Sequence, residues 1–136
     1  MLQGGCFCGW IRYEITGTPF NETNCHCSIC RRTTGAPFVA WFSVRPSEFR
    51  IVSGVPVRFR SSTKGTRSFC GHCGTQLTFQ GDDWPDEVDV TTCSLDHPEQ
   101  VPPSDHIHTS SKLRWIELSD GLSRHLEARP SHQAPA

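Results

Sequence analysis

The segment 24–32, NCHCSICRR, places three cysteines within six residues: Cys25, Cys27 and Cys30. Thiolate sulfur is a strong ligand for zinc. Structural zinc sites are closed by four protein ligands, whereas catalytic sites keep three and leave the fourth position open. This segment therefore supplies three sulfurs of a tetrahedral site and leaves one position to be explained. His26 lies between two of these cysteines and should face away from them in an extended chain, which favours a solvent-facing or supporting role.

The other five cysteines decide how that open position is interpreted. The segment FCGHCGT contains a C-x-x-C-G turn with Cys70 and Cys73, which supplies half of a tetrahedral site. Cys6 and Cys8 are two apart, so they project to the same side of an extended chain and can supply the other half. The count predicts a closed structural zinc site, an open zinc site and one spare cysteine. Their residues are Cys6, Cys8, Cys70 and Cys73 for the closed site, Cys25, Cys27 and Cys30 for the open site, and Cys93 as the spare.

Two other assignments of the cysteines are compatible with the sequence. The three-cysteine segment could be closed by Cys93 or by a histidine, which would make a second structural site. A disulfide framework is disfavoured, because the N-terminal residues carry no signal for export and a reducing cytosol keeps thiols free. The C-x-C pairs are also too close in sequence for an unstrained disulfide within either pair.

Charged residues near the open site are candidates for binding a substrate or moving a proton. Arg31 and Arg32 directly follow Cys30 and could bind carboxylates. The segment 58–67, RFRSSTKGTR, has four basic residues and no acidic one, and it could either bind carboxylates or form a solvated strand face.

His106 and His108 are two apart and could share one face near the site, where a histidine could accept the proton of an incoming thiol. Asp96 and His97, which follow Cys93, raise the same possibility.

Short strands must position these residues, because hydrophobic residues alternate with polar ones along much of the chain. Ile11, Tyr13 and Ile15 alternate in 10–15, and 37–44 is a continuous apolar run typical of a strand covered on both faces. Segments 48–54 and 55–60 resemble a hairpin that turns at Ser53 and Gly54, with Val55, Val57 and Phe59 on its inner face. Three more strands are predicted at 75–79, 87–93 and 112–118. Helix is expected only around SICRRTTG, and in a short piece at DGLSRHLE.

Composition sets the class of protein. The 136 residues fit one domain, predicted over 1–127, followed by a disordered tail over 128–136. Thirteen basic and 14 acidic residues give a net charge of -1, so no overall basic field favours nucleic acid or anionic membranes. No apolar run approaches the ~18 residues of a membrane span. We expect a mainly β, cytoplasmic domain that binds neither nucleic acid nor membrane.

Four segments of the chain resemble the glutathione-dependent formaldehyde-activating enzyme family, and they occur in the family's order. They are GGCFCGWIRYEI, CHCSICRRTTGAPFVAWF, SFCGHCGTQLTF and TTCSLDHPEQVPPSDHIHTSSKLRW. The resemblance implies an Mss4-like β-sheet fold around a structural zinc, and the same division of the cysteines into a structural and a catalytic site. It also implies condensation of formaldehyde with glutathione to S-hydroxymethylglutathione, a carbon-sulfur lyase reaction.

The predicted function is therefore a zinc-dependent carbon-sulfur lyase with two zinc ions per chain, one structural and one exchangeable. Its partners would be a small thiol such as glutathione and a small aldehyde. Two alternatives remain. One is a carrier that binds a thiol without chemistry, because thiols and formaldehyde combine readily unaided. The other is a zinc-stabilised interaction domain, for which the chain lacks the basic extensions that would favour chromatin.

Overall fold

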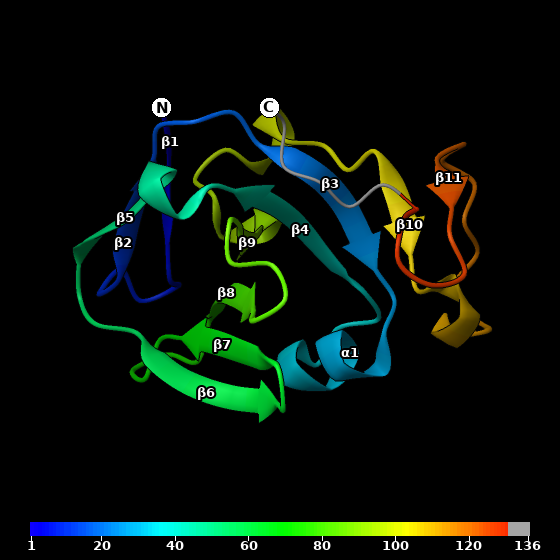
Figure 1. Ribbon diagram of the computed structural model, residues 1–136, viewed down its shortest axis with the longest axis horizontal. Coiled ribbons are helices and arrows are strands. Elements are labelled where there is room, and N and C mark those ends of the chain that lie inside the picture. Colours follow the sequence, from blue (N-terminus) through cyan, green and yellow to red (C-terminus); the bar gives the residue numbers. More distant parts are fainter. Residues whose placement is uncertain (131–136) are drawn as a thin grey trace.

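The structure of the protein, a computed structural model, describes residues 1–130 and is built mainly from β-strands (Figure 1). The strands are β1 (Leu2–Gly5), β2 (Arg12–Ile15), β3 (Phe20–Cys25), β4 (Val39–Val44), β5 (Phe49–Ser53), β6 (Val57–Ser62), β7 (Gly65–Phe69), β8 (Gln76–Gly81), β9 (Val88–Thr91), β10 (Asp105–Ile107) and β11 (Ser123–Arg124). The helix α1 spans Ser28–Thr34, and short 3-10 turns cover Pro46–Glu48, Thr92–Ser94, Pro98–Gln100 and Thr109–Ser111. The predicted mainly β class with short helical turns is confirmed.

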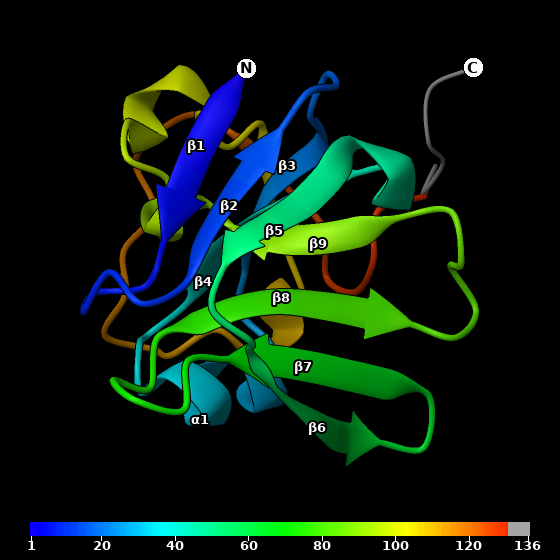
Figure 2. The ribbon, with the colours of Figure 1, turned by 90° about the vertical axis from the view of Figure 1, so that its left-hand side faces the viewer.

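The strands form two sheets within the described part of the chain. The small sheet has the order β1-β2-β5, and the large one has the order β11-β10-β3-β4-β9-β8-β7-β6. β10 runs parallel to β3 and β11, while the other pairs are antiparallel. Figure 1 shows the large sheet curving from β10 round to β6, and Figure 2 shows β9, β8, β7 and β6 side by side. The helix α1 connects β3 to β4, and the three-cysteine segment lies where β3 ends and α1 begins.

The main hydrophobic core lies between the two sheets. It combines Ile11 and the inner residues of β2, Tyr13 and Ile15, with Phe42 and Val44 of β4 and further residues of β8 and β9. The predicted alternation in 10–15 is confirmed, because Arg12 and Glu14 are only half-buried between these three fully buried residues. The predicted run at 37–44 also forms a strand, which is covered on both faces.

The predicted hairpin of 48–60 is wrong. β5 pairs with β2 in the small sheet, whereas β6 pairs with β7 at the edge of the large one. The chain turns from one sheet to the other at Gly54. Its φ of 77° favours glycine, and a Cβ there would lie 2.6 Å from the carbonyl oxygen of Trp10. As a result Val55, Val57 and Phe59 are exposed rather than internal.

Two C-terminal predictions are also wrong. Residues 112–118 form no strand and contain a turn at Arg114 and Trp115, and Lys112 Nζ donates to the carbonyl oxygens of Leu113 and Ile116. The predicted helix at DGLSRHLE contains the strand β11 instead. The backbone of this segment forms hydrogen bonds with the region of β10: the N–H of His125 donates to the carbonyl of His106 at 2.8 Å. Pairing with another segment replaces the internal hydrogen bonds that a helix needs.

The predicted tail falls partly within the described residues. Arg129 donates two hydrogen bonds to the Asp105 carboxylate, at 2.9 and 2.7 Å. Residues 131–136 lie outside the described part, so the prediction of disorder for them stays a prediction. Within residues 1–130, no helix is long and apolar enough to cross a membrane.

Candidate metal centres and their cavity

The four predicted structural ligands meet in space. Cys6 and Cys8 follow β1, while Cys70 and Cys73 lie in the turn between β7 and β8, and all four Sγ atoms are within 4.8 Å of one another. The Sγ atoms of Cys6 and Cys8 are 3.6 Å apart, and those of Cys8 and Cys70 are 3.8 Å apart. A tetrahedral zinc with Zn–S bonds of about 2.3 Å separates its sulfurs by about 3.8 Å. The donor set therefore fits one tetrahedral ion.

Backbone amides around this four-cysteine set point at its sulfurs. The N–H groups of His72 and Cys73 donate to Cys70 Sγ at 3.3 and 3.4 Å, and that of Ile11 donates to Cys6 Sγ at 3.2 Å. The turn closes through Gly74, whose φ of 82° favours glycine. Such N–H···S bonds orient thiolates and offset their charge. The set thus joins the segment between β1 and β2 to the large sheet.

The three-cysteine set lies where β3 ends and α1 begins. Cys25 is the last residue of β3, Cys27 is the N-cap of α1, and Cys30 lies in its first turn. Their Sγ atoms are within 4.8 Å of one another. Cys27 Sγ accepts a hydrogen bond from the N–H of Cys30 at 3.3 Å, so the capping interaction itself holds the two side chains together.

Ionisation within this set is strongly uneven. Hydrogen bonds from Cys25 and Cys30 lower the pKa of Cys27 to about 2, and the same contact with Cys27 raises the pKa of Cys25 far above the ordinary range for a thiol. One thiolate is therefore stabilised by neighbours that keep their protons. A divalent cation would let all three ionise together, so the donor set fits a metal ion.

A cavity of about 700 Å³ opens beside the three-cysteine set. All three cysteines line it, together with Trp41 of β4, Arg67 of β7 and Phe79 of β8. None of the four-cysteine set is among its lining residues within the described part of the chain. One set therefore has four cysteines, and the other has three and faces a space large enough for a small organic molecule.

His106, the predicted proton acceptor, is buried and is not among the residues that line the cavity. His26 is fully buried, and its Nε2 is 2.9 Å from His106 Nδ1, while His106 Nε2 is 2.7 Å from Asp120 Oδ2. Burial lowers the pKa of His26 to about 4. Neither histidine of this pair is among the lining residues of the cavity.

His108, two residues further on, does line the cavity. Its φ of 54° breaks the strand alternation, so His106 and His108 do not share a face. Of the other candidates, Asp96 forms an ion pair with Arg12, and Cys93 is exposed and belongs to neither set.

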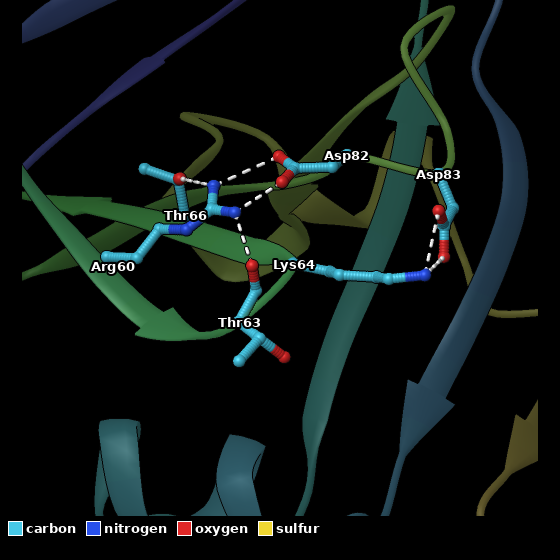
Figure 3. Close-up of polar contacts among 6 residues, drawn as sticks. All are labelled: Arg60, Thr63, Lys64, Thr66, Asp82 and Asp83. Atoms are coloured by element: carbon cyan, nitrogen blue, oxygen red, sulfur yellow. Dashed lines mark hydrogen bonds and ion pairs between the residues drawn. The ribbon is translucent and has the colours of Figure 1, made fainter.

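Arg31 and Arg32 are placed outside the cavity wall. The Arg31 guanidinium donates to the backbone carbonyls of His26 and Ser111, and Arg32 is exposed. The basic segment 58–67 separates into two groups. Arg60 pairs with Asp82 and Lys64 with Asp83 at the surface (Figure 3), and Arg58 binds Gln80. Arg67 alone among the four cations faces inward.

Sequence reasoning did not single out Arg67, Trp41 and Phe79 as wall residues. Trp41 is buried, and it lines the cavity. A signal for Arg67 was present in the alternation of β7, where residues 65, 67 and 69 share a face opposite to Thr66 and Ser68. The sequence of this strand does not indicate which face points inward, because both faces carry polar residues.

Fold and site together define a small β protein with one four-cysteine set and one three-cysteine set that borders a cavity. Residues 1–111 match the model of the family described as "Glutathione-dependent formaldehyde-activating enzyme". The chain belongs to this family, as its cysteine pattern indicated.

Relatives of the chain are similar over different lengths. A Halomonas elongata protein, provisionally named a glutathione-dependent formaldehyde-activating enzyme, is 27% identical over 127 residues, 87% of this chain and 81% of that protein. An uncharacterized lyase of Schizosaccharomyces pombe is 30% identical over 77 residues, which cover 57% of this chain and 56% of that protein. The crystal structure of a Rhodobacter sphaeroides protein is similar in fold, with a TM-score of 0.57, 24% identity and coverage of 90% of this chain and 98% of that one.

Proposed function

We propose that the protein is a zinc-dependent carbon-sulfur lyase of the S-(hydroxymethyl)glutathione synthase type. It joins a glutathione-like thiol to a small aldehyde such as formaldehyde, or releases the aldehyde from the adduct. The observation that carries this proposal is the three-cysteine set, open on one side to a cavity of about 700 Å³. Membership of the family and the name of the Halomonas relative support the choice of thiol and aldehyde.

The reaction needs no other reagent. A bond forms between the thiol sulfur and the carbonyl carbon, the carbonyl π electrons move to oxygen, and the thiol proton ends on that oxygen. A zinc ion held by Cys25, Cys27 and Cys30 would lower the pKa of the thiol and hold its sulfur as the fourth ligand.

The chain's own residues supply binding and orientation. The cavity encloses the thiol beside the three cysteines, and Trp41 and Phe79 give it apolar walls. Holding thiol and aldehyde together converts an encounter of two molecules into a reaction within one site. Among residues 1–130, His108 is the histidine that lines this space, while His26 and His106 form a hydrogen-bonded pair next to the segment that carries the cysteines.

The four-cysteine set would hold the second, structural zinc. We further propose a cytoplasmic location, where reduced thiols are maintained, since no disulfide joins any of the eight cysteines in the described structure. The Mss4-like fold implied by the family resemblance belongs to the same proposal.

Replacing Cys30 by serine tests the function. Cys30→Ser removes one ligand of the open set and leaves the four-cysteine set intact, so the fold and one tightly held zinc should persist. Formation of the S-hydroxymethyl adduct, followed by NMR against the spontaneous rate, should fall to that spontaneous rate. Full activity of this variant would contradict the proposal. Thiol binding by the wild type with no acceleration over the spontaneous rate would identify a carrier instead.

A further inference from the structure

Arg67 is a buried cation in the wall of the cavity. Its side chain projects from β7, and the residue is only 5% exposed. The guanidinium carbon lies 5.0 Å from the centroid of the Phe79 ring and 5.9 Å from that of Trp41. Two aromatic rings therefore hold the group in place through cation–π contacts, and neither ring can accept a conventional hydrogen bond from it.

The hydrogen bonds of this guanidinium are incomplete. Nε donates to Ser61 Oγ at 3.2 Å, and Nη2 lies 3.8 Å from Cys30 Sγ. Nη1 is buried and has no acceptor among residues 1–130. A buried guanidinium ordinarily has its five N–H groups paired, because an unmet donor in a desolvated place costs stability. The fold therefore leaves a place for an acceptor that the described residues do not provide.

The second arginine of the cavity wall shows that this gap is specific to Arg67. Arg129 also lines the cavity, but it binds both oxygens of Asp105, at 2.9 and 2.7 Å. Among the described residues, a carboxylate is therefore hydrogen-bonded to Arg129 and none is hydrogen-bonded to Arg67. A planar guanidinium matches a carboxylate in both charge and shape.

Arg67 is also close to the position where a substrate sulfur would sit. Sulfurs of one tetrahedral zinc are about 3.8 Å apart. Since Nη2 is 3.8 Å from Cys30 Sγ, a thiol completing the three-cysteine set lies no further than about 7.6 Å from Nη2. A carboxylate a few bonds from the thiol can span this distance.

We infer that Arg67 binds a carboxylate of the thiol substrate, so that the site selects thiols carrying an acidic group within a few bonds of the sulfur. This inference rests on the proposed function, because it assumes that a thiol enters the cavity. It names one side chain of β7 as the group that selects the substrate class. The surface cations of the same basic segment, Arg58, Arg60 and Lys64, have no such role in it.

A pair of small thiols tests the inference without turnover. Titration calorimetry on the zinc-loaded protein would compare 3-mercaptopropionate with its neutral analogue 3-mercaptopropionamide. In Arg67→Met, which keeps an apolar side chain between the rings, the dissociation constant of the acid should rise roughly 10- to 100-fold, as for loss of a hydrogen-bonded charged group. That of the amide should change less than about threefold. Taking wild-type-to-variant ratios cancels the different thiol pKa of the two ligands.

Matched variants keep the comparison interpretable. Arg58→Met removes an exposed arginine on the neighbouring strand that binds Gln80, and it should leave both affinities unchanged. Arg67→Lys keeps the charge but loses the planar fork, so it should recover part of the preference for the acid. Circular dichroism and the zinc content would establish that each variant is folded and loaded. Glutathione and its diethyl ester repeat the test on a larger ligand.

The possible results separate this inference from the function on which it rests. If neither thiol binds the wild type, the proposed function fails as well. If both bind and Arg67→Met weakens neither, only the inference is overturned. Equal weakening of both ligands, or loss of zinc, would mean that Arg67 offsets the charge of the cysteines. A fall in turnover with unchanged affinities would mean that it acts on the adduct oxygen, which also overturns carboxylate binding.

Discussion

Residues next to each other in sequence take different roles around the three-cysteine set because α1 begins inside it. Cys30 faces the cavity from α1, and each further helical residue is rotated by about 100°. Arg31 and Arg32 therefore turn away, and the Arg31 guanidinium is taken up by the carbonyls of His26 and Ser111. The sequence correctly grouped the cysteines of the two sets, because the spacing of residues that could share a metal ion is set by chemistry. It could not identify Arg67, which is 37 residues from Cys30 and reaches it only through sheet pairing.

The two arginines after Cys30 should differ in their effect on stability. Arg31→Met removes two part-buried hydrogen bonds to backbone carbonyls and should lower the free energy of unfolding by about 2 kcal/mol. Arg32→Met, the matched change at an exposed position, should stay within about 0.5 kcal/mol of the wild type. Urea denaturation of the zinc-loaded protein measures both. Thiol affinity should be unchanged in each variant; a weaker affinity in either would restore the substrate-binding role suggested by its place in the sequence.

At the scale of elements, alternation and apolar runs correctly predicted the strands whose inner residues are buried between the two sheets. β2 and β4 are such strands, since their inner residues belong to the core between the sheets. Strand and hairpin prediction failed where the structure of a segment depends on which strand it pairs with. β5 and β6 have similar patterns and follow each other, yet Gly54 sends them to different sheets. The segment at 123–124 forms a strand only because β10 lies beside it.

The pairing of Arg129 with Asp105 ties the C-terminal segment to β10, so removing it should cost stability. Asp105 is buried, and Arg129→Met leaves its carboxylate without the two hydrogen bonds. We expect a loss of about 3 kcal/mol at neutral pH. Arg114→Met, at an exposed position of the same segment, is the matched control. Chemical denaturation over a range of pH measures both variants.

The pH dependence of that loss has a definite sign. Burial raises the pKa of Asp105, but the hydrogen bonds from Arg129 and Thr23 and the positive charges of Arg129 and His125 together outweigh it, so the folded-state pKa is lowered. The stabilisation is therefore complete above the unfolded pKa of roughly 3.9 and is lost as the pH falls through the folded value. The difference between wild type and Arg129→Met should be largest near pH 7 and should shrink below about pH 4. A difference that grows on acidification would contradict the ion pair.

At the scale of the whole molecule, the two cysteine sets occupy positions with different consequences. The four-cysteine set links the loop after β1, which belongs to the small sheet, to the turn between β7 and β8 of the large one. Its Cys6 and Cys70 are part of the main core. The three-cysteine set lies at one end of the central strands and faces the cavity. Cysteine spacing predicted this division, but only the topology shows that one set joins the two sheets while the other borders open space.

Removing metal in two stages should therefore separate folding from function. A chelator titration of the zinc-loaded protein is expected to withdraw the ion of the three-cysteine set first, because one face of that site is open, with little change in circular dichroism and with loss of thiol binding. Withdrawal of the second ion should coincide with unfolding, because binding energy at a closed structural site is also folding energy. Cys70→Ser should lower the melting temperature far more than Cys30→Ser. Simultaneous release of both ions, or an unfolding transition that accompanies the first, would show that the two sets do not divide the roles in this way.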